Sequence, residues 1–344
     1  MDRKFQWDPA SDQTYQARFG DSRLKADTFN KVCGRHFMMD APGCTLTLDA
    51  SSNVQSSPVF DWTDDPVSKE MTRIQVQSGT LIVEYDSQTD EFAIGNLTDD
   101  PLERIELSVS ANATLNFRGI YLQAIDPMAE GLEPGCNIDV DGHFQMSNGC
   151  SLIANVTVNN NGIMSILGQS FDFGDRSSLV VSSEPVGSKF SFAAIVDEDA
   201  KIASNSYMQF MGSSNSVLEC RDLVLSGNAV IEVCDNARLE VVAHKSLKAE
   251  NSYFNIRGKS AELKITYAMN FNENDGYNGI FNFIRDENHP KDNKSKIVLN
   301  SVSDMEYALL MKGNYVTVDG DVAVYGTDFT LKRNKSQAII TLVV

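Results

Sequence analysis

The sequence has no long apolar run of the kind that would place it in a membrane. None of its apolar stretches reaches the roughly 18 residues that a membrane-spanning helix needs. The polar start, Met1 to Phe5, is followed by no apolar segment typical of a signal peptide. We therefore expect no membrane insertion and synthesis in a cytoplasm, where the protein either stays or is packed into a virion-type particle.

Residues that commonly carry catalysis or bind metals are few and scattered. The sequence contains neither a P-loop nor a G-x-G-x-x-G, H-E-x-x-H or G-x-S-x-G motif. Its four histidines lie far apart, at His36, His143, His244 and His289. We expect no catalytic residue, no metal site and no cofactor, and we interpret each histidine as structural.

The six cysteines form no C-x-x-C pair, which argues against a zinc ribbon or a thioredoxin-type site. Cys220 and Cys234 lie at or beside apolar positions of expected strands. A free cysteine at such a position commonly acts as a small core residue. We favour that interpretation over disulfide bonds.

Positive charge is scarce. The chain has 29 Lys and Arg residues against 47 Asp and Glu, a net charge of −18. Neutralising phosphates requires clustered Lys and Arg, so we expect no nucleic-acid partner. The acidic surface is interpreted as a source of solubility.

One short pattern returns at a fixed interval. It begins at Asn205, Asn228 and Asn251, so the interval is 23 residues each time. Every copy has Asn first, apolar residues at the fourth and sixth positions with a polar residue between them, and Gly or Asp at the eighth. The alternation predicts a strand with one buried face, and the eighth position suits a turn with φ > 0. A strand and turn at this interval predict a solenoid.

Further copies precede these three. They begin at Asn112 and Asn161, with a looser copy at Asp141 and a degenerate one near Ser178. If the coils align, the leading asparagines stack, and we expect a ladder in which their side-chain amides bond to each other and to turn backbones. The segment 184–187 between two copies is a candidate loop.

Two longer related blocks lie upstream. Arg73-Ile-Gln-Val matches Arg104-Ile-Glu-Leu, and Thr80-Leu-Ile-Val matches Thr114-Leu-Asn-Phe. Their spacing of about 31 to 35 residues indicates a coil that carries a loop.

Three short strands per coil of 22–24 residues predict an all-β fold, a right-handed parallel β-helix. We divide the chain into an N-terminal cap or attachment segment (1–55), the β-helix (56–285) and a C-terminal β-strand cap (286–344). Within the last segment Asp319-Gly320 predicts a hairpin turn.

The stretches from Ile163 to Gly168 and from Leu225 to Val233 resemble the β-helical solenoids of phage tailspike and other virion proteins, and of autotransporter-type adhesin passengers. The resemblance is one of architecture, spans about residues 75–285, and transfers no functional residue. Similarity to virion proteins implies association with copies of the chain, often as trimers, or with other particle proteins.

Parallel β-helices also include polysaccharide lyases and hydrolases, and glycoside hydrolysis needs two carboxyl groups about 5–9.5 Å apart. Aspartate is also common in turns, and we favour that interpretation for the candidates. These are Asp139 with Asp141, Asp172 with Asp175, and Asp197 with Glu198 and Asp199.

The leading hypothesis is a non-catalytic structural or adhesive β-helix, a self-assembling component of a phage or virion-type particle, with a glycan as the candidate ligand. One alternative is a tailspike-like polysaccharide-degrading enzyme, a glycoside hydrolase or lyase. The other is a cell-surface adhesin fragment. Because the repeat positions have structural explanations, we expect binding in the irregular loops and ends.

Overall fold

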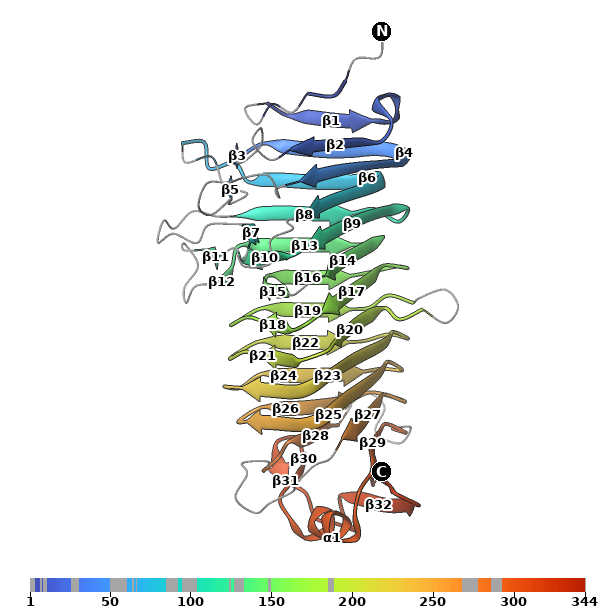
Figure 1. The fold of residues 1–344 in the computed structure, drawn as a ribbon. Helices are drawn as coiled ribbons and strands as arrows, with labels where there is room; N and C mark the ends of the chain where they lie inside the picture. The colour runs from blue at the N-terminus through green and yellow to red at the C-terminus, as the bar shows by residue number, and fades with distance from the viewer. Residues whose placement is uncertain are drawn as a thin grey trace. The chain divides into compact units, whose positions relative to one another are not determined.

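The structure, a computed structural model, is an all-β protein in which most strand pairs are parallel (Figure 1). The residues that it describes are 4–6, 8, 11–25, 31–49, 61–63, 65, 67–84, 92–94, 104–123, 125–126, 133–147, 150–184, 189–267, 278–285 and 293–343. The chain divides into two compact units, Met1–Ser177 and Ser178–Val344. Each unit contains its own ladders of parallel strands.

Unit 1 contains three such ladders. The first runs through β1 (Gln13–Gln16), β4 (His36–Asp49), β6 (Thr72–Glu84), β8 (Ile105–Val109), β13 (Cys136–Val140) and β16 (Asn155–Val158). The second runs through β2 (Ser22–Lys25), the later halves of β4 and β6, β9 (Ala113–Arg118), β14 (His143–Ser147) and β17 (Ile163–Gly168). The third runs through β7 (Phe92–Ile94), β10 (Ile120–Gln123), β15 (Cys150–Ile153) and β18 (Phe171–Phe173).

Three smaller elements complete unit 1. They are the 3-10 turn η1 (Ala17–Phe19), the parallel pair β3 (Lys31–Cys33) and β5 (Asp61–Thr63), and the antiparallel pair β11 (Ile125–Asp126) and β12 (Glu133–Pro134).

Unit 2 also contains three ladders. The one built from the sequence repeat, here called the repeat ladder, runs through β19 (Ser178–Val181), β22 (Tyr207–Phe210), β24 (Val230–Cys234), β26 (Tyr253–Arg257), β28 (Phe281–Ile284) and β30 (Val316–Val318). The second runs through β20 (Phe192–Val196), β23 (Asn215–Ser226), β25 (Arg238–Glu250), β27 (Glu262–Tyr267) and β29 (Lys296–Asn300). The third joins β21 (Asp199–Ile202) to the later halves of β23 and β25.

The sequence repeat sets the register of the repeat ladder. Ile231 of β24 pairs with Phe254 of β26, and Phe254 pairs with Phe281 of β28, so the apolar fourth positions stack. All three side chains are at most 1% exposed. The sixth positions stack in the same way, as Val233 on Ile256. The predicted strand with one buried face is confirmed, and each buried Phe or Ile contributes about 1.5–3 kcal/mol through the hydrophobic effect.

The turn after each copy has the predicted backbone conformation. Gly212, Asp235 and Gly258 at the eighth positions have φ values of 66°, 57° and 111°. An added Cβ at Gly258 would lie 2.4 Å from the backbone nitrogen of Asp235, so glycine is required there by space as well as by φ. The predicted turn is confirmed.

One of the two sequence matches differs from the strand register. The sequence match places Ile74 opposite Ile105, but Ile74 of β6 pairs with Leu107 of β8, two residues farther on. The later match is confirmed, because Leu81 pairs with Leu115. The candidate loop 184–187 lies outside the described residues apart from Glu184.

The end of the chain departs from the parallel pattern. The helix α1 (Asp304–Lys312) was not predicted from the sequence, and it begins with a capping box between Ser303 and Glu306. Strands β32 (Phe329–Asn334) and β33 (Gln337–Leu342) are antiparallel, and β33 also pairs antiparallel with β29. Strand β31 (Asp321–Val322) pairs antiparallel with β30 through the two-residue turn Asp319-Gly320. Both turn residues have positive φ, 55° and 87°, which confirms the predicted hairpin.

Candidate functional site

The outward face of the repeat ladder carries a column of polar side chains. The fifth residue of each copy lies between two core residues and therefore faces away from the core. The ladder register aligns these residues across neighbouring strands as Gln209, Glu232, Asn255, Asn282 and Thr317. The column changes from a charged cluster at Glu232 to a run of neutral side chains beyond it.

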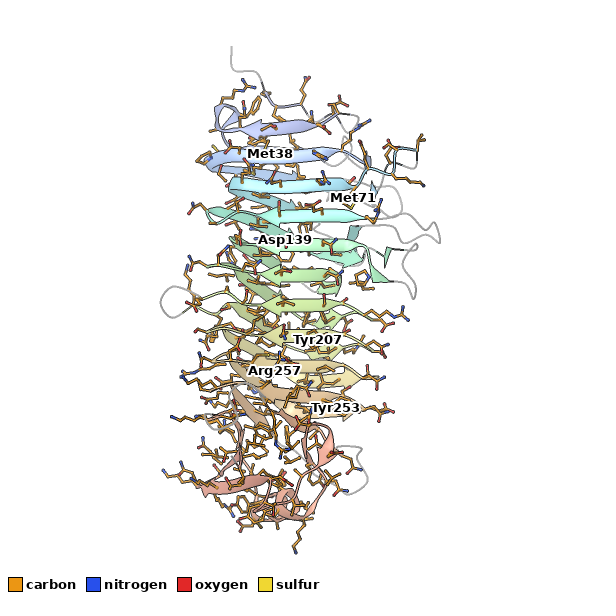
Figure 2. The ribbon with its side chains drawn as sticks, turned by 180° about the vertical axis from the view of Figure 1, so that it is seen from behind. Met38, Met71, Asp139, Tyr207, Tyr253 and Arg257 are labelled. Carbon is orange, nitrogen blue, oxygen red and sulfur yellow. The ribbon has the colours of Figure 1, made fainter. Side chains whose placement is uncertain are left out.

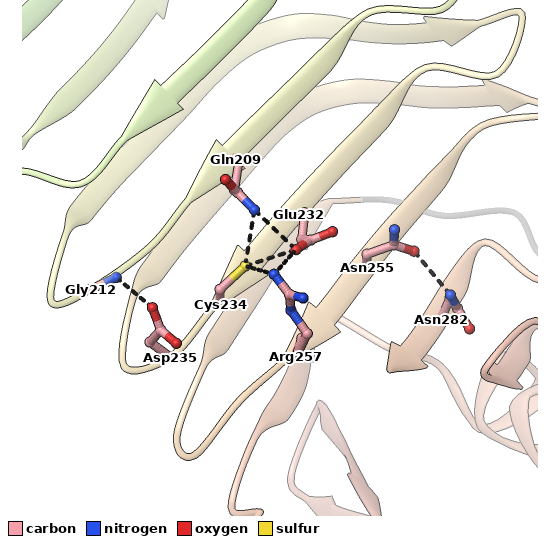
Figure 3. Close-up of polar contacts among 8 residues, drawn as sticks. All are labelled: Gln209, Gly212, Glu232, Cys234, Asp235, Asn255, Arg257 and Asn282. Carbon is pink, nitrogen blue, oxygen red and sulfur yellow. Dashed lines mark hydrogen bonds and ion pairs between the residues drawn. The ribbon is translucent and has the colours of Figure 1, made fainter. Parts of the chain in front are cut away.

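The Glu232 cluster consists of Glu232, Gln209, Cys234 and Arg257 (Figure 3). One carboxylate oxygen, Oε1, accepts from Gln209 Nε2 at 3.2 Å and from Cys234 Sγ at 2.9 Å, and it lies 3.0 Å from the Arg257 guanidinium. Glu232 is only 6% exposed. A buried carboxylate whose oxygen already has three partners is poorly placed to act on a ligand.

The same environment makes Cys234 and Tyr207 unreactive. Burial, followed by the hydrogen bond to Glu232, raises the pKa of the Cys234 thiol to about 12. Burial and the negative charge of Glu232 also raise the pKa of the Tyr207 hydroxyl. Both groups therefore keep their protons at neutral pH. The prediction that Cys220 and Cys234 are free is confirmed, and both are buried. However, Cys234 is more than an apolar core residue, because its thiol donates a hydrogen bond to Glu232 on the outward face.

Beyond this cluster the column becomes a chain of neutral hydrogen bonds, here called the amide column. Asn282 Nδ2 donates to Asn255 Oδ1 at 3.1 Å (Figure 3). Asn282 Oδ1 accepts from Thr317 Oγ1 at 3.0 Å and from the backbone N–H of Gly320 at 3.1 Å. These contacts fix the orientation of Asn282 and direct the Nδ2 group of Asn255 away from it.

A groove lies along the amide column. Its cavity volume is about 490 Å³, within the roughly 300–1,000 Å³ typical of ligand sites. We call it the amide groove, and it is lined by Tyr253, Asn255, Asn278, Gly279, Asn282, Asn314, Thr317, Gly320 and Val322. None of these residues is charged. Tyr253 lies on the same face of unit 2 as Tyr207 and Arg257 (Figure 2).

The leading asparagines of the repeat have a different role from the predicted one. Asn205, Asn228 and Asn251 are exposed and have φ values of 58°, 68° and 50°. The hydrogen bond between Asn228 and Asn251 joins the backbone N–H of the first to the carbonyl of the second, at 3.0 Å. The amide-to-amide contact of this ladder occurs instead at the fifth positions, between Asn255 and Asn282. The leading asparagines therefore serve as left-handed turn residues, and the expected side-chain ladder at their positions is not what the structure shows.

Unit 1 has a second polar surface on the first ladder. Arg73 on β6 lies 2.8 Å from Glu106 on β8 and 3.3 Å from the His36 ring on β4, beside a small cavity of about 160 Å³. Asp139 on β13 faces outward on the same ladder. Partial burial and the negative charges of Glu106 and Asp141 raise the pKa of Asp139.

Of the remaining candidate carboxylates, Asp141 and Asp175 lie in a bend and a turn, whereas Asp172 does not. Asp141 follows β13 in a bend and accepts from Asn160 Nδ2 at 2.7 Å. Asp175 lies in a turn beside Arg176. Asp172 lies within β18, and Asp139 lies within β13, so the turn interpretation is wrong for these two residues.

The acidic residues 197–199 also lie in a bend or form an ion pair. Asp197 and Glu198 form an exposed bend, and Asp199 lies 2.8 Å from Arg221. These contacts agree with the structural interpretation of the turn carboxylates.

Two further features bear on function. In the part of the chain that the structure describes, no three His, Cys, Asp or Glu side chains come together in a way that could hold a metal ion. The described segments also contain no helix with the length and apolar character needed to cross a membrane. The described histidines lie on separate strands, β4, β14 and β25, and His289 lies outside the described residues.

Comparison with known proteins gives no relative. No family model, no curated protein and no solved structure matches this chain. The functional assignment therefore depends on the chemistry of the two outward faces.

Proposed function

We propose that this chain is a non-catalytic structural or adhesive protein built on a right-handed parallel β-helix with three strands per coil. The support for the architecture is that each unit has three ladders whose strands pair in parallel with strands about one coil away. The N-terminal cap (1–55), the C-terminal cap (286–344), self-association and membership of a virion-type particle remain predictions from the sequence.

One observation carries the adhesive function. The outward column of the repeat ladder presents neutral amide and hydroxyl groups beside a groove, and its carboxylate, Glu232, is closed off by three partners. Such a surface has groups for recognition but no free acid or base for bond cleavage. A glycan, whose hydroxyl groups both donate and accept hydrogen bonds, fits this chemistry.

The test is incubation of the purified protein with a panel of capsular and cell-wall glycans. Binding is measured by calorimetry, and released oligosaccharides are measured by mass spectrometry. We expect binding without release, and release of oligosaccharides by the native protein would overturn the non-catalytic function. A mass measurement at high micromolar concentration tests self-association, and a monomer would contradict it.

The second candidate function is polysaccharide cleavage on the first ladder of unit 1. Its support is the position of Asp139 and Glu106, which face outward from adjacent strands, and the raised pKa of Asp139, which suits a general acid. If the native protein releases oligosaccharides, Asp139→Asn and Glu106→Gln should each abolish release. Asp197→Asn, in an exposed bend, is the matched control and should leave release unchanged. Release that persists in both site variants would contradict this assignment.

A further inference from the structure

The amide groove is neutral although the chain as a whole is strongly acidic. The chain has a net charge of −18, yet the described residues that line the groove include no Asp, Glu, Lys or Arg. Two cations of the neighbouring strands are engaged in ion pairs, Arg257 with Glu232 and Arg285 with Asp319. An anionic ligand would therefore find no free cation in the lining and would enter against the overall field of the protein.

The groove keeps hydrogen-bonding groups available for a ligand. Among the described residues, the side chains of Asn278 and Asn314 and the hydroxyl of Tyr253 have no hydrogen-bond partner, and neither does Nδ2 of Asn255. An amide offers two donors and an acceptor, and a phenol offers one donor and an acceptor. This mixture complements a ligand with many hydroxyl groups, each of which also donates and accepts.

Apolar surface in the groove complements the polar groups. Tyr253 is 36% exposed, and Val322 at the hairpin is 58% exposed. A sugar ring has hydroxyl groups at its edge and C–H groups on its faces, so it can bond to the amides while it packs against the tyrosine ring and the valine.

The walls of the groove are fixed before any ligand binds. Asn282 is held by three hydrogen bonds, and Gly320 belongs to the tight turn between β30 and β31. Gly279 has φ of 70°, and an added Cβ there would lie 3.2 Å from Thr317. A preformed site loses little conformational entropy on binding, which favours recognition of a flexible oligosaccharide.

We propose that the amide groove binds a neutral oligosaccharide segment and discriminates against acidic glycans. This inference rests on the adhesive function proposed above and specifies its site and ligand class. Tyr253 packs against a ring face, and the amides of Asn255, Asn278 and Asn314 bond to hydroxyl groups.

The experiment titrates the full chain with two sets of oligosaccharides of equal length, neutral glucans and mannans in one set and uronic-acid or sialylated oligosaccharides in the other. Binding is followed by calorimetry. The groove variants are Tyr253→Ala and Asn314→Asp, which places a negative charge in the lining. The matched controls on the same unit are Tyr325→Ala and Asn228→Asp, which are both exposed and are not among the lining residues. Circular dichroism confirms that each variant is folded.

We expect a neutral oligosaccharide to bind the native protein, and each groove variant to weaken that binding about tenfold or more, because stacking or charge neutrality is lost. The controls should bind as the native protein does. Binding that survives both groove variants, or a preference for acidic glycans, would overturn this inference while leaving an adhesive function in place. If the native protein binds no glycan in either set, both this inference and the adhesive function fail.

Discussion

Replacing Arg257 by methionine should destabilise unit 2, because it leaves the Glu232 carboxylate without its cation. Glu232 is 6% exposed, and its Oε1 lies 3.0 Å from the guanidinium. Methionine keeps much of the length and apolar stem of arginine but removes its charge and its N–H donors. The substitution therefore removes the ion pair with little change in packing.

The expected magnitude follows from the exposure of the two partners. Removing one partner of a fully buried ion pair costs about 3–5 kcal/mol, whereas a fully exposed pair contributes about 0–1 kcal/mol. The Glu232 side chain is 8% exposed and the Arg257 side chain 47% exposed, so this pair lies between the limits. Gln209 and Cys234 still donate to the carboxylate. We expect the free energy of unfolding to fall by about 2 kcal/mol.

The assay combines urea unfolding, followed by circular dichroism, with native-state hydrogen exchange. In a repeat protein the loss should be greatest near the substitution, at the amides of β24 and β26. Arg238→Met is the matched control, because Arg238 is exposed and makes no ion pair within the described part of the chain. It should change stability by less than about 0.5 kcal/mol.

A second variant separates charge from packing. Adding Glu232→Gln to the Arg257→Met background removes the unpaired charge and keeps the size of the side chain, so it should restore most of the lost stability. Two results would refute this reasoning: Arg257→Met as stable as Arg238→Met, or a double variant no more stable than Arg257→Met alone.

Three other substitutions or conditions test separate parts of unit 2. Gly258→Ala should lower the free energy of unfolding by about 2–4 kcal/mol, because the alanine Cβ would clash with the backbone of Asp235 and because alanine disfavours this positive φ. A decrease of less than about 1 kcal/mol in urea unfolding would contradict this prediction. Cys234 should resist alkylation in the folded protein, and rapid labelling at pH 8 would be inconsistent with this. The contribution of its thiol to stability should also decrease as the pH rises above about 9, because the thiol of the unfolded chain ionises before that of the folded chain, whose pKa is about 12. Ser303→Ala should cost about 1 kcal/mol by removing the cap that accepts from the Glu306 N–H, as measured by thermal unfolding, whereas Ser303→Asp should retain most of it.

The repeat ladder could be predicted from sequence because its signals agree. A constant interval of 23 residues and a strict apolar–polar–apolar alternation bring Met208, Ile231 and Phe254 into one stack. A shift of one residue would turn every core residue outward, so that register is excluded. The turn at the eighth position could also be predicted, because Gly and Asp both tolerate φ > 0.

In the first ladder of unit 1, the hydrophobic pattern of the sequence does not determine the strand register. The sequence aligns Ile74 with Ile105, but the structure pairs Ile74 with Leu107. A shift of two residues keeps every apolar side chain on the same face, so hydrophobic patterning does not distinguish the two registers. The observed register places Arg73 opposite Glu106, where they form an ion pair. That contact between strands has no local signal in either segment.

A helix and the role of the leading asparagines were not predicted from the sequence, for different reasons. The helix α1 had a local signal, the Ser303–Glu306 capping box, which the abundance of strands around it obscured. The leading asparagines were ambiguous, because asparagine suits both amide ladders and left-handed turns. The choice between those roles depends on where the turn begins, and the positive φ of Asn228 places it in the turn before β24.

The amide groove lies where the repeat loses its regular interval. Residues bonded across the column are 23 apart between Gln209 and Glu232, 27 apart between Asn255 and Asn282, and 35 apart between Asn282 and Thr317. The longer connections between these strands add turn residues beside the ladder, and Asn278 and Asn314 on those turns line the groove. Binding is therefore expected neither in the regular repeat alone nor in the loops alone. The repeat supplies rigid amides, and the lengthened turns supply the wall that makes a flat column concave.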